Sequence, residues 1–114
     1  MLLQNAFVGS LVADAVSMPV HWYYDTGAMD SDYGCITGYV KPRNPHPDSI
    51  LWRSSYNPAS SHINILHHHA EFWGRRNVHY HQFLEAGENT LNLKLAVELY
   101  HHVISEGSYK VDTW

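Results

Sequence analysis

The sequence predicts an all-α fold, because it contains two apolar segments with helical spacing and no strand pattern. Residues 1–17 are almost continuously apolar until Pro19, which disfavours helical backbone at the residue before it. Residues 90–105 place Leu91, Leu95 and Leu99 at steps of four, the spacing of one helix face. No hairpin turn stands between alternating apolar and polar runs, so no strand pair is predicted.

The first predicted helix, residues 1–17, is apolar around nearly its whole circumference. At about 100° per residue, its apolar side chains occupy three sides: Leu3, Phe7 and Leu11; Val8, Val12 and Val16; and Leu2, Ala6 and Ala13. A helix of this kind is typical of the interior of a multi-helix core, where no side meets solvent. We therefore expect other helices to cover it.

Residues 23–70 are rich in turn-forming residues and are predicted to form a long irregular connection. The run Asn44-Pro45-His46-Pro47-Asp48 and the later pair Asn57-Pro58 favour turns over helix. Aromatic side chains supply apolar area that can hold the segment in place: Tyr23, Tyr24, Tyr33, Tyr39, Trp52 and Tyr56. A long ordered connection is more often functional than not.

The third segment contains a short predicted helix and a longer one. Residues 80–86 are predicted to form the short helix, which Gly87 ends. The longer helix spans residues 90–105, with Asn89 or Thr90 as its N-cap and Gly107 as its C-terminal stop. Two strong helices cannot bury each other completely, which indicates that further helices or another subunit cover them.

Composition places the chain among globular domains and excludes several classes of function. The 114 residues suffice for one domain, and 45% of them are hydrophobic. The net charge is −4 and no basic run exceeds Arg75-Arg76, so neither a nucleic-acid partner nor a membrane partner is predicted. Cys35 is the single cysteine, which excludes an internal disulfide and favours a cytoplasmic location. We expect its side chain to be buried or half-buried.

Histidines are frequent, with ten in the chain, and they raise the question of a zinc site. Neither the pair His79 and His81 nor the tract at residues 67–69 has the His and Cys spacing of a structural zinc site. We predict imidazoles that lie at the surface or pack within loops.

Asp14 is the first candidate site residue. On a helical wheel it falls between Leu3 and Phe7, inside an apolar face. A buried carboxylate without a partner is costly, so Asp14 must meet a hydrogen-bond donor, a cation or a metal shell. Two interpretations stay open: a structural carboxylate that anchors loop backbone, or a group at or behind a metal or sugar site.

Residues 86–90 are the second candidate site. Glu88, Asn89 and Thr90 place carboxylate, amide and hydroxyl oxygens at a helix start, directly after Gly87. Such oxygens suit a hard cation such as Mg²⁺. The alternative is an ordinary N-cap with an acidic residue that complements the helix dipole, and spacing alone favours this alternative.

Three motifs resemble those of one known family, in the same order and at similar separations. The run Ala6-Phe7-Val8-Gly9-Ser10-Leu11-Val12-Ala13-Asp14-Ala15 is similar to the first-helix signature of the ADP-ribosylglycohydrolases, with Ala13 in place of a glycine. The run Val20-His21-Trp22-Tyr23-Tyr24-Asp25 resembles a variant in the branch that includes jellyfish-crystallin-like proteins. Residues 81–92 resemble that branch's counterpart of a Thr-Asp-Asp-Thr metal motif.

This resemblance implies an all-α, orthogonal multi-helix domain that binds two Mg²⁺ ions and cleaves the glycosidic bond between ADP-ribose and an acceptor. The partner would be an ADP-ribosylated protein or small molecule. Carried over residue by residue, the resemblance makes Glu88, Asn89 and Thr90 metal ligands and Asp14 a substrate-binding group. It makes His21 and Asp25 the catalytic candidates for proton handling. Gly87 and Asn89 depart from the pattern, because they stand where a threonine and an aspartate are usual.

The family's second metal motif, an Asp-x-Asp-Thr run, is absent from the 114 residues. We therefore expect residues 1–114 to be the N-terminal part of a single ADP-ribosylglycohydrolase-like domain with an incomplete metal site. Two alternatives to an enzyme remain open: a non-enzymatic, crystallin-like structural protein, and a fragment without function.

Overall fold

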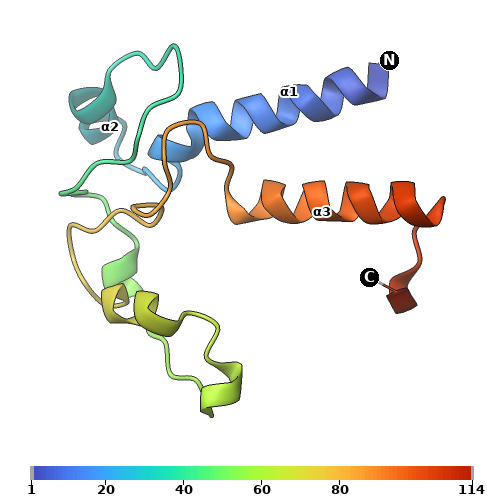
Figure 1. Cartoon of the computed structure of the whole chain (residues 1–114). Helices are drawn as coiled ribbons and strands as arrows, with labels where there is room; N and C mark the ends of the chain where they lie inside the picture. The colour runs from blue at the N-terminus through green and yellow to red at the C-terminus, as the bar shows by residue number, and fades with distance from the viewer. Residues whose placement is uncertain (1, 114) are drawn as a thin grey trace.

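The computed structural model describes residues 2–113 and contains no β-strand in this range. Its three α-helices are α1 (Leu2–Ser17), α2 (Thr26–Tyr33) and α3 (Leu91–Glu106) (Figure 1). Short 3₁₀ helices lie in the connections: η1 (Met18–Val20), η2 (Leu51–Arg53), η3 (Ser61–Ile63), η4 (His67–Phe72) and η5 (Val111–Thr113). The predicted all-α class is therefore confirmed.

The two long helices agree with the predicted segments to within about a residue. α1 ends at Ser17, and Pro19 follows inside η1. α3 begins after Thr90, whose backbone is extended, and ends at Gly107, whose φ of 70° is left-handed. Since a glycine has no Cβ to clash in this conformation, Gly107 is a good C-terminal stop.

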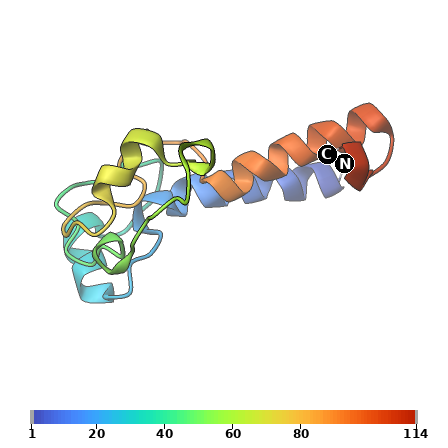
Figure 2. The ribbon, with the colours of Figure 1, turned by 90° about the horizontal axis from the view of Figure 1, so that it is seen from below.

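The helices of residues 2–113 do not cover α1 on all sides, in keeping with the expectation that the two long helices cannot bury each other completely. Within α1 only Ala15 is buried, and the side chains of Leu2 and Leu3 are 87% and 85% exposed. α3 runs antiparallel beside α1 (Figures 1 and 2), and the stacked rings of Phe7 and Tyr100 join them with centroids 4.8 Å apart. One neighbouring helix can cover only one side of α1, so its other apolar sides meet no helix in the described chain.

α2 lies inside the segment that was predicted to be irregular. Its N-cap is Asp25, whose carboxylate accepts the N–H of Ala28 at 3.0 Å, and it ends at Gly34 with a φ of 60°. Aspartate is a preferred N-cap and glycine a common stop, so both boundary signals were present. The residues between them do not place apolar side chains at helical spacing, so no apolar pattern indicated this helix.

The helix predicted at residues 80–86 does not form. The chain makes turns there instead, with Gln82 N–H donating to the carbonyl of His79 and Leu84 N–H to that of His81. The rings of His79 and His81 are both buried. Both backbone bonds join residues three apart, which is the spacing of turns and not the spacing of four found in an α-helix.

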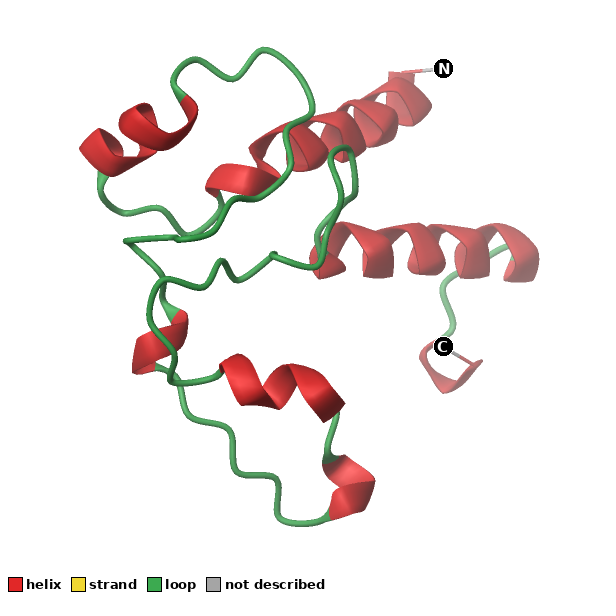
Figure 3. Cartoon of the chain, turned by 60° about the vertical axis from the view of Figure 1, so that its left-hand side comes forward, coloured by secondary structure: helices red, strands yellow, loops and turns green. Residues whose placement is uncertain are grey.

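Most buried side chains belong to the loop-rich part of the molecule, whose connections are green in Figure 3, and Ala15 is the one buried residue within the two long helices as described. The fully buried side chains of the loop-rich part combine apolar groups with imidazoles: Met18, Pro19, Leu51, His46 and His79. α1 and α3 project from this part (Figure 2), and the radius of gyration is 16.9 Å, against about 13 Å for a compact chain of this length. No helix within residues 2–113 combines the length and apolar content needed to cross a bilayer.

Candidate functional site

Asp14, near the end of α1, accepts three hydrogen bonds from the start of α3. The backbone N–H and the hydroxyl of Thr90 donate to its carboxylate at 2.7 and 2.8 Å, and the Asn89 side chain donates at 3.0 Å. Thr90 is buried, and Asp14 and Asn89 are half-buried. We call these three residues the Asp14 clasp, because they join the two long helices where α1 ends and α3 begins.

The clasp replaces the usual cap of α3. The first N–H groups of a helix have no partner inside it, and the helix dipole favours negative charge at this end. Thr90 is the N-cap residue, but its hydroxyl makes no capping bond to α3. Asp14 instead receives the N–H of Thr90 from a different helix. This geometry is that of a structural carboxylate that anchors backbone, the first interpretation given above.

The partners of Asn89 determine which way its amide lies. The side-chain nitrogen donates to the carbonyl oxygen of Leu11 at 2.7 Å as well as to Asp14. Both partners are acceptors, so only the amide nitrogen satisfies them. The amide oxygen therefore points away from Asp14.

Hydrogen bonding lowers the pKa of Asp14 below its ordinary value. Burial by itself raises the pKa, but the bonds from the Thr90 backbone, from Asn89 and from the Thr90 hydroxyl outweigh it. The nearby His21 ring acts in the same direction. Asp14 is therefore ionised at neutral pH, as the clasp requires.

A pair of histidines lies next to the clasp. His21 Nδ1 and His81 Nε2 are 2.8 Å apart, and the two rings stack with centroids at 5.1 Å. The chain continues inward, because His81 N–H donates to His79 Nδ1 at 2.9 Å, and His79 Nε2 lies 2.8 Å from the carbonyl of Pro19. A carbonyl can only accept, so His79 carries its hydrogen on Nε2 and is neutral.

Burial lowers the pKa of His79 and of His81 to about 4. For His79 the hydrogen bond to Pro19 opposes this shift, and the neighbouring His46 and His21 add to it. For His81 the charges of His21 and His79 add to the effect of burial, while Asp14 opposes it. Both buried rings are therefore neutral near pH 7, as expected for imidazoles that pack within loops.

A small cavity of about 100 Å³ borders the clasp and the histidine pair. We call it the Thr90 cavity; its lining residues are His21, Trp22, Tyr80, His81, Thr90, Leu91 and Asn92. A second cavity of about 290 Å³ shares Tyr80, His81 and Leu91 with it and adds Phe83 and Lys94. Polar hydrogen-bonding groups and aromatic rings therefore line adjoining hollows at the start of α3.

The other two predicted site residues have different partners. Glu88 accepts the N–H of Glu85 at 2.6 Å and forms an ion pair with Lys94 at 3.2 Å. Asp25 is exposed and caps α2. No hydrogen bond or ion pair between described residues links either of them to Asp14. The structure therefore gathers His21, Asn89 and Thr90 around Asp14 and leaves Glu88 and Asp25 outside the clasp.

As arranged, the described residues do not fit a Mg²⁺ site by themselves. Both oxygens of Asp14 and both oxygens of Glu88 already accept hydrogen bonds or an ion pair. Asn89 directs its side-chain nitrogen toward Asp14. The NH₂ nitrogen of an amide has no free lone pair and does not bind a metal ion. Within residues 2–113 no group of three or more His, Cys, Asp or Glu side chains is placed to hold a metal ion.

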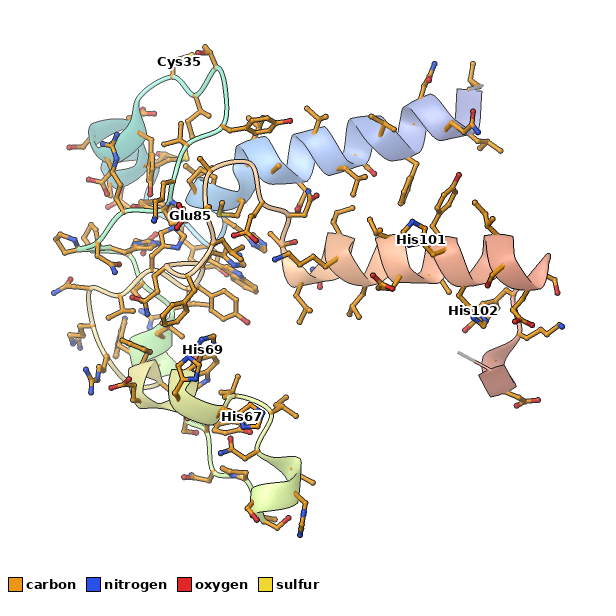
Figure 4. The ribbon with its side chains drawn as sticks, in the orientation of Figure 1. Cys35, His67, His69, Glu85, His101 and His102 are labelled. Atoms are coloured by element: carbon orange, nitrogen blue, oxygen red, sulfur yellow. The ribbon has the colours of Figure 1, made fainter. Side chains whose placement is uncertain are left out.

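Sequence reasoning missed His81 as a neighbour of the site, although it began the third motif. Its spacing of two from His79 was the available signal, since alternate residues of an extended segment share a side. Cys35, expected to be buried or half-buried, is exposed on the loop after α2 (Figure 4).

A scan against models of protein families, a search of curated proteins and a search of solved structures each returned no match. The resemblance to a family therefore rests on the three motifs, and the clasp with its adjoining cavities is the structural feature that bears on function.

Proposed function

We propose that this chain supplies the α1–α3 framework of an ADP-ribosylglycohydrolase-type hydrolase, which cleaves the glycosidic bond between ADP-ribose and an acceptor. One observation carries the proposal. Asp14 and Asn89-Thr90 belong to two motifs that the resemblance pairs, and they meet in the clasp although about 75 residues separate them. His21, from the motif at residues 20–25, lies beside them.

In this proposal the clasp positions residues and the histidine pair handles a proton. When His21 donates its Nδ1 hydrogen to His81, its Nε2 keeps a lone pair, and the His21 ring borders the Thr90 cavity. A water that adds to the anomeric carbon of the substrate would give its proton to this nitrogen as the glycosidic bond breaks. The acceptor would leave with the bonding electron pair and take up a proton from His21 or from solvent.

The adjoining cavities suit the two ends of such a substrate. Asn92 offers its side-chain amide for sugar hydroxyls in the Thr90 cavity, and the Thr90 hydroxyl oxygen can still accept a hydrogen bond there. Tyr80 and Phe83, with Lys94 nearby, offer aromatic faces and a cation in the larger cavity. An ADP-ribosylated protein or small molecule in the cytoplasm is the proposed partner, and the single exposed thiol of Cys35 is compatible with a reducing compartment.

Glu88 and Asn89 could bind Mg²⁺ only after their side chains rearrange. Glu88 would have to leave Lys94, and Asn89 would have to turn its oxygen toward the ion. Bound there, the ion would hold and polarise sugar oxygens. Asp25, which caps α2, has no role in the proposed chemistry.

A non-enzymatic, crystallin-like role is the second candidate, and the closed state of the clasp favours it. Every oxygen of Asp14 and every clasp donor is used inside the chain. When all the hydrogen-bonding groups of a site pair within the chain, the site stabilises the fold without a ligand.

Calorimetric titration of the full chain separates the two candidates. ADP-ribose is titrated with and without Mg²⁺, and AMP, which lacks the second ribose, is the ligand control. The proposal expects a saturable heat for ADP-ribose that AMP does not give and that His21→Gln reduces. Absence of any heat for ADP-ribose in both conditions contradicts the proposal and leaves the structural role.

A further inference from the structure

Two arginines outside the clasp stack on one indole ring. The guanidinium carbons of Arg53 and Arg76 lie 4.7 and 4.0 Å from the ring centroid of Trp52. Both arginines and Trp52 are exposed, with 37% of the Trp52 surface accessible to solvent. Both guanidinium groups therefore lie against the same ring, although their like charges repel each other.

The backbone around Trp52 fixes this arrangement. Trp52 and Arg53 belong to η2, which starts at the buried Leu51. Gly74 N–H donates to the carbonyl of Leu51 at 2.8 Å, and its φ of 82° turns the chain so that Arg76 returns alongside η2. The backbone segments that carry the two arginines are thus joined to each other at the buried Leu51.

The hydrogen-bond donors of both guanidinium groups are open. Stacking uses the flat face of a guanidinium and leaves its N–H edge free. Neither Arg53 nor Arg76 donates a side-chain hydrogen bond or forms an ion pair with another described residue. The nearby carboxylate of Glu71 is paired with Arg75 at 3.5 Å.

A cavity of about 160 Å³ lies beside Arg53 and Trp52. Tyr24, Ser49 and Ile50 line it, together with Asp48. The Asp48 carboxylate accepts the N–H groups of Tyr24 and Asp25, so its charge is offset by backbone donors. Arg53 lines this cavity and Arg76 stacks on its Trp52 wall, so the cavity has room for an organic group attached to an anion that the arginines hold.

We propose that Arg53 and Arg76 bind a phosphate dianion, either free or as the monoester of a small molecule. A phosphate offers several charged oxygens at angles that match the N–H fork of arginine. Two guanidinium groups already held together on Trp52 lose little freedom when the anion bridges them. This site shares no residue with the Asp14 clasp and does not depend on the proposed hydrolase activity.

The test is an NMR titration of the full chain that follows the Nε–H signals of its arginines and the indole N–H of Trp52. The probes are inorganic phosphate and phenyl phosphate, with sodium chloride at matched ionic strength as the control. Saturable shifts of Arg53, Arg76 and Trp52 with phosphate, but not with chloride, are expected. Tighter binding of phenyl phosphate assigns the cavity to the organic part of a monoester, and equal binding assigns the site to phosphate alone.

Substitutions complete the test. Arg53→Gln and Arg76→Gln are each expected to weaken phosphate binding about tenfold, and Arg53→Lys several-fold, because lysine keeps the charge but loses the fork. Arg43→Gln is the matched control, since Arg43 also stacks on a ring, that of Tyr33, but donates to the Asp32 carbonyl. Shifts that chloride reproduces, or equal weakening by Arg43→Gln, would overturn the site.

Discussion

Thr90 donates both its backbone N–H and its hydroxyl to the carboxylate of Asp14, at 2.7 and 2.8 Å. These bonds connect the C-terminal part of α1 to the first residue before α3, and Asn89 adds a third. The contact caps α3 and ties together two helices whose faces are otherwise largely exposed. Its removal should therefore be visible in the stability of the whole chain.

Asp14→Ala is expected to lower the free energy of unfolding by about 2–3 kcal/mol, because it leaves the donors of Thr90 and Asn89 without their acceptor. Urea denaturation followed by circular dichroism measures the change. Asp30→Ala is the control, since Asp30 is an exposed aspartate on α2, and it should stay within about 0.5 kcal/mol of the parent. Equal effects of the two substitutions would show that the clasp contributes nothing.

Asn89→Asp tests the orientation of the Asn89 amide. The substitution places a second negative charge against Asp14 and the Leu11 carbonyl. A loss of about 2 kcal/mol at pH 7 is expected, from the lost donor and the repulsion. Asn92→Asp, an exposed change in the first turn of α3, should be neutral or slightly stabilising, because it complements the helix dipole. If Asn89→Asp has the same urea midpoint of unfolding as the parent, the Asn89 nitrogen does not donate to Asp14 and Leu11.

Acid is expected to destabilise the fold through His79 and His81. Their pKa of about 4 in the folded chain is below the ordinary 6.5, so the unfolded chain binds protons first as the pH falls. The stability that both neutral rings contribute is complete above pH 6.5 and is lost between about 6.5 and 4. Each ring adds a slope of about 1.4 kcal/mol per pH unit in this window.

Unfolding midpoints measured from pH 7 to pH 5 check this slope. His79→Gln should make it shallower, whereas His62→Gln, at an exposed histidine of η3, should leave it unchanged. Asp14 acts at lower pH, because its pKa is lowered from 3.8 and its contribution disappears only below that value. A flat profile between pH 6.5 and 5 would contradict the neutral, buried state of the two rings.

Gly107→Ala is expected to cost about 1 kcal/mol through backbone strain alone. Gly107 has a φ of 70°, and a Cβ there would meet no atom within 4 Å. Gly38→Ala is the matched control, because Gly38 also has open space but no left-handed φ. The control should be neutral or slightly stabilising, since alanine restricts the unfolded chain. Thermal unfolding of both variants gives the comparison, and identical midpoints would exclude strain at Gly107.

The local features of the chain could be read from the sequence because they depend on neighbouring residues. The apolar run at residues 1–17, the leucines at steps of four and Gly107 determined α1 and α3 almost to the residue. α2 was missed because its cap at Asp25 and its stop at Gly34 enclose residues without an apolar period. The turns at residues 80–86 were missed because the burial of His79 and His81 in one interior, not helix propensity, decides the backbone there.

The candidate site depended on contacts that no local pattern contains. The sequence identified Asp14 as a carboxylate in need of a donor, and it identified Asn89 and Thr90 as polar groups at a helix start. Only the tertiary structure decided that these residues satisfy one another, that Asn89 offers its nitrogen, and that Glu88 pairs with Lys94 instead. The physical reason is that helix formation follows from side-chain spacing along a few turns, whereas the partner of a buried polar group is set by which distant segments fold against it.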